Sequence, residues 1–217
     1  MTQFLEDARQ FMPILLQGAY VTVQIAFLSL ALSTVLGLAL ALMRMSSLPL
    51  LYVPAVTIIT GLRGIPIIVQ LFYIYFVLPE IGIDLSAFAA GVIGLGVAYS
   101  AYHAENFRAA ILAVDRGQYE AALSIGMGKA QLMRRIILPQ AIRIVLPPYG
   151  NITIMMLKDS SLASTITVSE MTRAGQLIAS STFKNMTVFT LVALIYLAMS
   201  LPLTALNSWL ERRFAAK

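Results

Sequence analysis

The sequence contains no cysteine, a single histidine (His103), and few charged residues, which make up 12% of its 217 positions. Without cysteine there can be no disulfide, no thiolate chemistry and no cysteine-bound metal, and one histidine cannot build a multi-histidine metal site. The chain also lacks a glycine-rich loop ending in Lys-Ser or Lys-Thr, the pattern that cradles nucleotide phosphates. We therefore expect no metal site, no catalytic residue and no cofactor within this chain.

Apolar residues dominate instead, at 59% of the chain. A soluble domain usually carries about twice the charged fraction found in this chain. The apolar stretches are long enough to cross a bilayer as helices, and their continuity excludes the alternating pattern of a membrane barrel. Five spans are expected, at residues 13–43, 48–79, 85–112, 141–168 and 186–206. The sequence thus predicts an all-α membrane protein with one transmembrane domain over residues 1–217, and no removable signal peptide is apparent.

The net charge of +5 is best explained by orientation, because Lys and Arg gather on the cytoplasmic side of membrane proteins. An odd number of spans puts the two chain ends on opposite sides, and the basic residues favour an inner C-terminus. The inner loops would hold Arg44, Arg116, Lys129, Arg134, Arg135, Arg212, Arg213 and Lys217, and the outer loops only Arg9, Arg173 and Lys184. This distribution argues against a nucleic-acid partner.

One basic cytoplasmic segment, within residues 113–140, contains "EAALSIGMGKAQLMRRIILP". It is either an ordinary inner loop with helical propensity or a helix–corner–helix that docks another protein. Glu120 favours a helix start, Ala121 and Ala122 leave a flat surface, and Gly126 permits a sharp corner. A second helical piece over residues 129–138 would bury its three apolar residues before Pro139, Ile136 to Leu138, and would end at the proline.

The same segment carries a known motif: Glu120-Ala121-Ala122, then Gly126, then Ile136 and Leu138-Pro139 at the spacing of the EAA motif. The chain resembles the membrane subunits of bacterial ABC importers, specifically the histidine/glutamine/cystine-type polar amino acid permeases. Further similar segments are residues 18–46, 63–79, 101–111 and 146–162, so the resemblance covers nearly the whole chain. Two departures are Ser160, where many members have Thr, and Ala98-Tyr99, near which many members have Asn.

The resemblance implies a MetI-like transmembrane domain of about five helices in the bacterial inner membrane, with a periplasmic N-terminus and a cytoplasmic C-terminus. It implies ATPase-driven alternating access that carries a polar amino acid inward. The implied partners are a cytoplasmic ABC ATPase dimer that binds the ATP, a periplasmic amino-acid-binding protein, and a second permease subunit, identical or homologous. Glu120, Ala121, Ala122 and Gly126 would form the coupling helix that seats on the ATPase.

Polar residues inside apolar runs are costly and often functional. Arg63, Gly64 and Pro66 predict a bend, at which Arg63 would bind freed carbonyl groups. Glu105 either pairs with Arg108, three residues further on, or lines the pathway and receives an ammonium group.

Asp159, with its neighbouring serines, offers partners for an amino acid's ammonium and carboxylate groups. By analogy with polar amino acid permeases, Asp159 and Ser161 are candidate pathway residues. His103 is a further candidate, although a packed, hydrogen-bonded histidine is the commoner case.

Two other functions compete with the importer. A secondary transporter driven by an ion gradient would usually show internal repeats in a longer chain, and none is evident. An intramembrane hydrolase could draw on Ser160, Ser161, His103 and Asp159, but no nucleophile elbow is present. The hydrolase would leave the residue 120–139 segment without a purpose, and the secondary transporter would need no ATPase.

Overall fold

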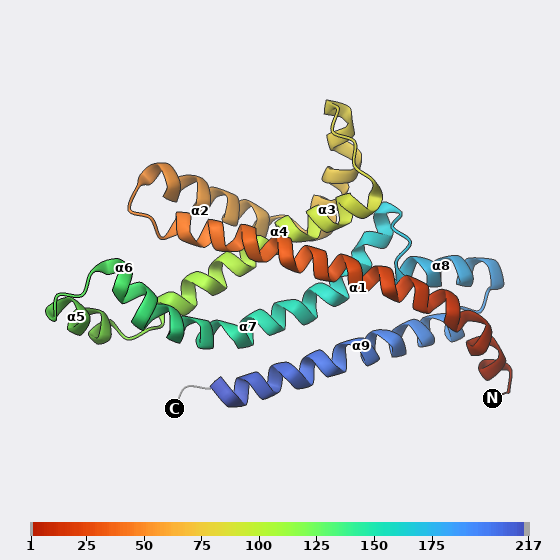
Figure 1. The fold of residues 1–217 in the computed structure, drawn as a ribbon. Coiled ribbons are helices and arrows are strands. Elements are labelled where there is room, and N and C mark those ends of the chain that lie inside the picture. Colours follow the sequence, from red (N-terminus) through yellow and green to blue (C-terminus); the bar gives the residue numbers. More distant parts are fainter. Residues whose placement is uncertain (1, 215–217) are drawn as a thin grey trace.

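The structure, a computed structural model, describes residues 2–214, and this part of the chain is helical with no strand. Four long helices form its body: α1 (Thr2–Arg44), α4 (Ala87–Leu112), α7 (Leu138–Asp159) and α9 (Asn185–Phe214). In Figure 1, α1 runs through the middle of the molecule, α4 crosses beside it, and α7 and α9 lie along its other side. The predicted all-α fold is therefore confirmed.

Shorter elements connect these helices. They are α2 (Pro49–Gly64), α3 (Ile67–Phe72), the π-helix Tyr73–Val77, the 3-10 helix Leu78–Ile81, α5 (Arg116–Ser124), α6 (Lys129–Leu132), the π-helix Met133–Ile137, the 3-10 helix Ser160–Ile166 and α8 (Met171–Thr182). Figure 1 places α5 and α6 at one end of the molecule, with the last turns of α9. The start of α1 and α8 lie at the opposite end, and α3 with the turns that follow it projects from the side.

Three helices are long and apolar enough to cross a membrane, namely Gln3–Arg44, Ala87–Leu112 and Asn185–Phe214. Pro49–Gly64 and Ile67–Ile81, bent by 105°, add a fourth if they form one broken span. The remaining predicted span, residues 141–168, corresponds to α7 and the turn after it. At 22 residues, or about 33 Å, α7 is long enough to cross, but it is less apolar than the others. Length and composition thus support three of the five predicted spans, and a fourth if the bent pair forms one span; α7 is supported by its length alone.

The break between α2 and α3 lies where the sequence predicted a bend. Gly64 ends α2, and Pro66, with φ −55° and ψ 138°, precedes α3. The carbonyls freed at the break are bound by Gln70, whose Nε2 donates to Leu62 O at 2.8 Å and to Ile65 O at 2.9 Å.

Arg63 was expected to bind these carbonyls, and that expectation is wrong. Gln70 is one turn into α3 and faces back across the break, so its amide reaches the carbonyls first. The Arg63 guanidinium lies instead over the ring of Tyr102, 5.6 Å from its centroid, which is within the range of a cation–π contact.

Small residues let the long helices approach closely, as is common where lipid removes the hydrophobic driving force. A Cβ added to Gly37 of α1 would lie 2.6 Å from the Cβ of His103 of α4. A Cβ added to Gly96 of α4 would lie 2.7 Å from Leu32 of α1. This contact sets α1 and α4 together as the frame on which the other helices pack.

At the opposite end from α5, a buried carboxylate ties three helices together. Glu170 is fully buried and caps α8 by accepting from the backbone N–H groups of Arg173 and Thr172, at 2.7 and 2.9 Å. The hydroxyls of Tyr196 in α9 and Thr22 in α1 donate to the same carboxylate, at 3.1 and 3.3 Å. Burial raises the pKa of the Glu170 carboxyl above its ordinary value, and these hydrogen bonds act against the rise. Sequence reasoning placed this segment outside the membrane but missed the junction.

Candidate functional site

The motif segment folds as a short helix, a corner and a second helix. Asp115 caps α5, and its Oδ1 accepts from the backbone N–H of Gly117 at 2.7 Å. Glu120 therefore lies in the middle of α5 rather than at its start, which corrects the sequence prediction. An Asp at this position is a strong helix N-cap, so it outweighs the weaker preference of Glu for a first turn.

The corner itself is formed by Gly126, as predicted. Its φ is +78°, a conformation that side-chain-bearing residues rarely adopt. No atom lies within 4 Å of the position that a Cβ would take at Gly126, so the corner projects into open space. The glycine is required by the backbone, not by packing inside this chain.

Beyond the corner, the helix does not end at Pro139. α6 passes through the π-helix Met133–Ile137 directly into α7, and Pro139 sits in the first turn of α7. The wider π turn changes the hydrogen-bond register just before the proline, so the chain continues without the N–H that proline lacks. Ile137 is buried as predicted, whereas Leu138 is 39% exposed, contrary to the prediction.

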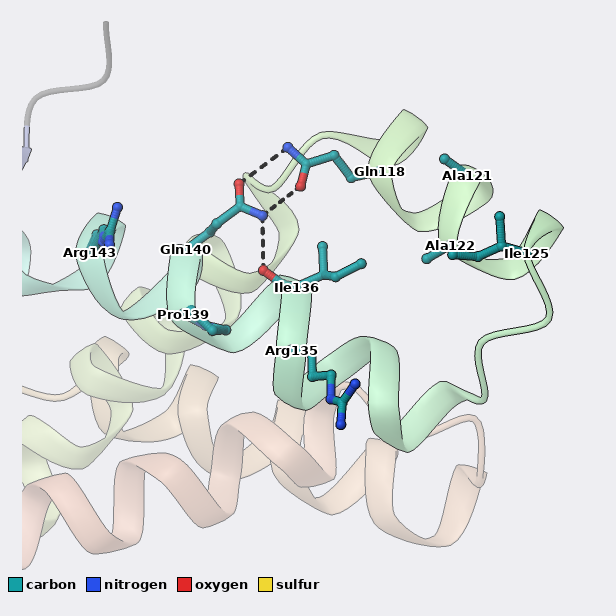
Figure 2. A pocket seen from close by; sticks show the side chains of 9 residues that line it. All are labelled: Gln118, Ala121, Ala122, Ile125, Arg135, Ile136, Pro139, Gln140 and Arg143. Atoms are coloured by element: carbon teal, nitrogen blue, oxygen red, sulfur yellow. Dashed lines mark hydrogen bonds between the residues drawn. The ribbon is translucent and has the colours of Figure 1, made fainter.

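A groove of about 570 Å³ lies between α5 and the start of α7. It is lined by Gln118, Ala121, Ala122, Ile125, Arg135, Ile136, Pro139, Gln140 and Arg143 (Figure 2). Ala122 is 3% exposed and packs inside this end of the molecule, while Ala121 and Glu120 are exposed. The surface is thus apolar on the alanine side and basic along α7.

The basic residues of this end are available to a partner. Arg134, Arg135 and Arg143 are exposed, and the ion pairs formed within residues 2–214 all lie elsewhere. The segment therefore presents small residues, a corner and unpaired guanidinium groups at one end of a helical bundle, which is a geometry suited to docking.

At the far end of α7, Asp159 has a definite partner. The hydroxyl of Tyr99 in α4 donates to Asp159 Oδ2 at 2.6 Å, and Tyr99 is 1% exposed. Ser161 is half-buried, and the hydroxyl of the buried Ser160 donates to the Leu157 carbonyl at 2.7 Å. Tyr99 was noted in the sequence as a departure from the family pattern, but its contact with Asp159 was not foreseen.

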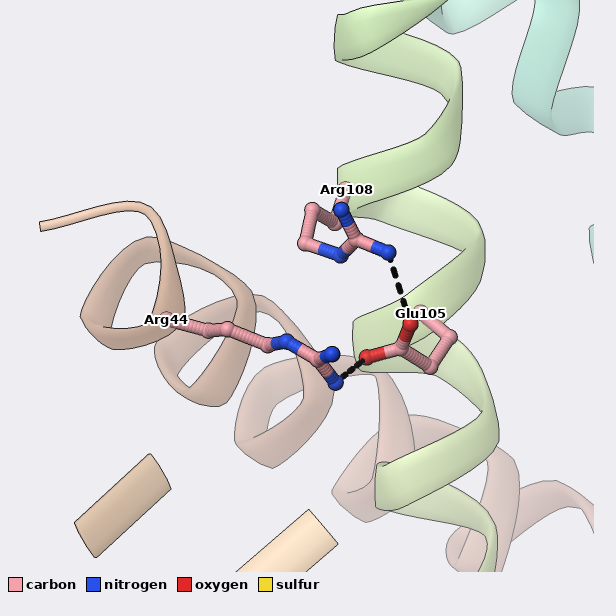
Figure 3. Close-up of polar contacts among 3 residues, drawn as sticks. All are labelled: Arg44, Glu105 and Arg108. Atoms are coloured by element: carbon pink, nitrogen blue, oxygen red, sulfur yellow. Dashed lines mark hydrogen bonds and ion pairs between the residues drawn. The ribbon is translucent and has the colours of Figure 1, made fainter. Parts of the chain in front are cut away.

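Glu105 is held by two arginines (Figure 3). Its Oε2 accepts from Arg108 at 3.1 Å, which is the intrahelical pair that the sequence allowed. Its Oε1 accepts from Arg44 at the end of α1, a contact that the sequence analysis missed. Both carboxylate oxygens are therefore occupied in this structure, which favours the structural role of Glu105 over the binding of an ammonium group.

His103 is fully buried, stacked on Phe107 and tilted against Tyr149, with ring centroids 5.7 and 4.8 Å away. Neither ring nitrogen has a hydrogen-bond partner within residues 2–214, so the histidine expected to be hydrogen-bonded is packed without such a bond in this part of the chain. Ser160, His103 and Asp159 are not linked by the hydrogen bonds of residues 2–214, and the geometry offers no hydrolytic triad.

Comparison with known proteins agrees with this geometry. Residues 10–216 match the family described as "Binding-protein-dependent transport system inner membrane component". The chain is 44% identical over 203 residues to the "Probable amino-acid ABC transporter permease protein YckA" of Bacillus subtilis, covering 94% of this chain and 90% of that one. It is 38% identical over 203 residues to the glutamine transport system permease protein GlnP of Escherichia coli, covering 93% of both.

Solved structures show the same fold. One, described as an amino acid ABC transporter with histidines, superposes with a TM-score of 0.92 at 41% identity and covers 97% of this chain and 98% of that one. The inward-facing methionine transporter MetNI superposes with a TM-score of 0.80 at 21% identity over 94% of this chain, which supports the fold alone. The resemblance, the MetI-like fold and the inner-membrane location are confirmed. The chain belongs to the family of binding-protein-dependent transport system inner membrane components.

Proposed function

We propose that this chain translocates a polar amino acid through the inner membrane as the permease of an ATP-binding-cassette importer. ATP is bound and hydrolysed by a separate cytoplasmic ATPase dimer, and a periplasmic binding protein delivers the solute. A second permease subunit, identical or homologous, completes the pathway. The observation that carries the proposal is the motif-bearing α5, with its exposed Ala121 and Gly126 corner, presented at one end of a bundle of membrane helices.

The chain is oriented with its N-terminus in the periplasm and its C-terminus in the cytoplasm. This orientation is supported by the position of α5, α6 and the end of α9, which lie toward the same end of the molecule (Figure 1). Their arginines then lie on the cytoplasmic side, where basic residues accumulate. Glu120, Ala121, Ala122 and Gly126 act as the coupling surface, because the space around the corner is open.

Asp159 and Ser161 form the pathway's polar contact for the solute. Asp159 retains one carboxylate oxygen, Oδ1, that accepts no hydrogen bond in residues 2–214, and Ser161 adds a half-exposed hydroxyl. These groups suit the ammonium group of an amino acid, and the printed names of relatives that carry amino acids, glutamine or L-cystine support this class of solute. Glu105 and His103 serve the pathway by holding α4 in place.

The test is to purify the chain with its co-expressed ATPase and reconstitute uptake in proteoliposomes. Uptake is expected to require ATP inside the cytoplasmic compartment and the binding protein on the opposite side. Uptake driven by an ion gradient without ATP, or a chain that binds no ATPase, would overturn the proposal.

A further inference from the structure

A pair of glutamines fastens α5 to α7 across the groove. Gln140 Nε2 donates to Gln118 Oε1 at 2.5 Å, and Gln118 Nε2 donates to Gln140 Oε1 at 3.3 Å. Figure 2 shows the two amides face to face, one from each helix. We call this pair the amide clasp. Within residues 2–214 no other side-chain hydrogen bond joins α5 to α7.

Gln140 also donates a hydrogen bond to the backbone four residues before it. Its Nε2 donates to the Ile136 carbonyl at 2.9 Å, and Ile136 lies in the π-helix that leads into α7. The amide of Gln140 thus connects the π segment, α7 and α5. A π turn inside an α-helix is a frequent mark of a functional position, because it is strained relative to its neighbours.

The helix that carries Gln140 ends at Asp159. α7 is one continuous helix from Leu138 to Asp159, and at 1.5 Å per residue the two residues are about 28 Å apart along its axis. Although Pro147 and Pro148 lie within α7, the helix is unbroken, so a shift imposed on its first turn is carried to the Asp159–Tyr99 contact. Ala122, Leu132, Ile137 and Ala141 share one apolar cluster, and the paired amides add a directional restraint to this packing.

We propose that the amide clasp is the positioning contact through which α5 moves α7. Gln118 and Gln140 transmit a displacement of the docked α5 to α7, and α7 transmits it to the Asp159 end of the pathway. This inference rests on the proposed function, since it assigns a route for the force that an ATPase applies to α5. Neither glutamine touches the solute.

The geometry predicts an asymmetry between two conservative variants. In Q118E, the carboxylate still accepts from Gln140 Nε2, and Gln140 keeps its bond to the Ile136 carbonyl. In Q140E, the donor to both acceptors is lost, and only the 3.3 Å contact from Gln118 is available. Q118L and Q140L remove the clasp altogether.

The experiment reconstitutes the complete transporter, with ATPase and binding protein, and measures ATP hydrolysed per solute imported. Q118L, Q140L and Q140E are expected to raise this ratio about two- to tenfold, which corresponds to the net free energy of about one hydrogen bond. Q118E is expected to stay within about twofold of the unmodified chain. Exposed Gln131 in α6, which makes no side-chain hydrogen bond in residues 2–214, provides the matched controls Q131L and Q131E.

Two readouts separate the inference from the function on which it rests. Q140L and Q140E should purify with the ATPase in the same amount as the unmodified chain, because neither variant changes a residue of α5. If the unmodified chain couples ATP hydrolysis to uptake and Q140L or Q140E does so equally well, the inference is wrong. If Q118E raises the ratio as much as Q140E does, the predicted difference between the two variants is absent, and the inference is also wrong.

Discussion

A polar side chain within a membrane protein needs a hydrogen-bond partner from the protein itself, because the bilayer core supplies no water. Asp159 accepts from a phenol of α4 rather than pairing with Lys158, which directly precedes it but is exposed. A hydrogen bond to a charged group contributes about 1.5–3 kcal/mol, so Tyr99 has a measurable effect on the stability of the α4–α7 contact.

Replacing Tyr99 with phenylalanine tests this contact. We expect Y99F to lower the thermal unfolding midpoint in detergent by roughly 4–10 °C, because Asp159 loses its donor while the ring still fills its space. Y20F is the control, since Tyr20 is 66% exposed and makes no side-chain hydrogen bond in residues 2–214. A midpoint for Y99F equal to that of Y20F would show that the bond has no stabilising role.

Glu105 distinguishes a structural carboxylate from a solute contact. In double-mutant cycles with glutamine, its coupling to Arg44 is expected at about 1 kcal/mol and its coupling to Arg108 at about 0.3–0.5 kcal/mol. The first pair joins two helices, whereas the second lies within one helix. The free energy of unfolding of the single and double variants measures both. An E105Q variant with unchanged unfolding but a raised KM for uptake would instead favour the solute contact.

At the scale of elements, variants at the corner after α5 can distinguish the conformation that the backbone requires at Gly126 from the contact that a docked partner makes there. Asn and Asp both tolerate positive φ better than other residues, and the space around Gly126 is empty in this chain. G126N and G126D should therefore both reach the membrane in normal amounts.

G126D should abolish ATPase association and lower uptake by at least about tenfold, because an unpaired carboxylate would be buried at the contact. G126N, which lacks the charge, should retain more of both. Co-purification and uptake assays read the two effects. Uptake by G126D at the level of the unmodified chain would contradict the role of this corner in coupling.

Sequence reasoning located these elements better than it located their ends. The bend at residues 63–66 and the corner at Gly126 follow from local backbone preferences of proline and glycine, and both are present. The helix end predicted at Pro139 was wrong, because the chain passes through a π turn just before the proline and continues as α7. A π turn leaves no clear pattern in the sequence. Gln70 could have been found, because a polar side chain in an apolar run needs a partner.

Across the whole molecule, the fold class could be predicted from the sequence, but the contacts between distant segments could not. Hydropathy was enough to predict a helical membrane protein, and the family resemblance added the inner-membrane location. Arg44, Tyr99 and Thr22 lie 61, 60 and 148 residues away from their respective partners Glu105, Asp159 and Glu170. No periodicity within a single sequence encodes such pairs, so Arg44, Tyr99 and Thr22 were missed.

The absence of cysteine makes the orientation of the whole chain directly measurable. A cysteine at Met186, which is 88% exposed, should react with a membrane-impermeant maleimide on intact spheroplasts. A cysteine at exposed Ser124 in α5 should react only after permeabilisation. The chain contributes no background thiol. Labelling in the reverse order would invert the proposed topology.

The buried junction at Glu170 also has a consequence for biosynthesis. Thr22 and Glu170 are separated by 148 residues, which a ribosome adding about 5–20 residues per second needs roughly 7–30 s to make. The interval is longer still for Asp7, whose ion-pair partner Lys184 is made 177 residues later. Throughout that interval the first helix resides in the membrane without its late partners. The end of the protein that holds this junction therefore acquires its contacts only after Lys184 and Tyr196 have been made.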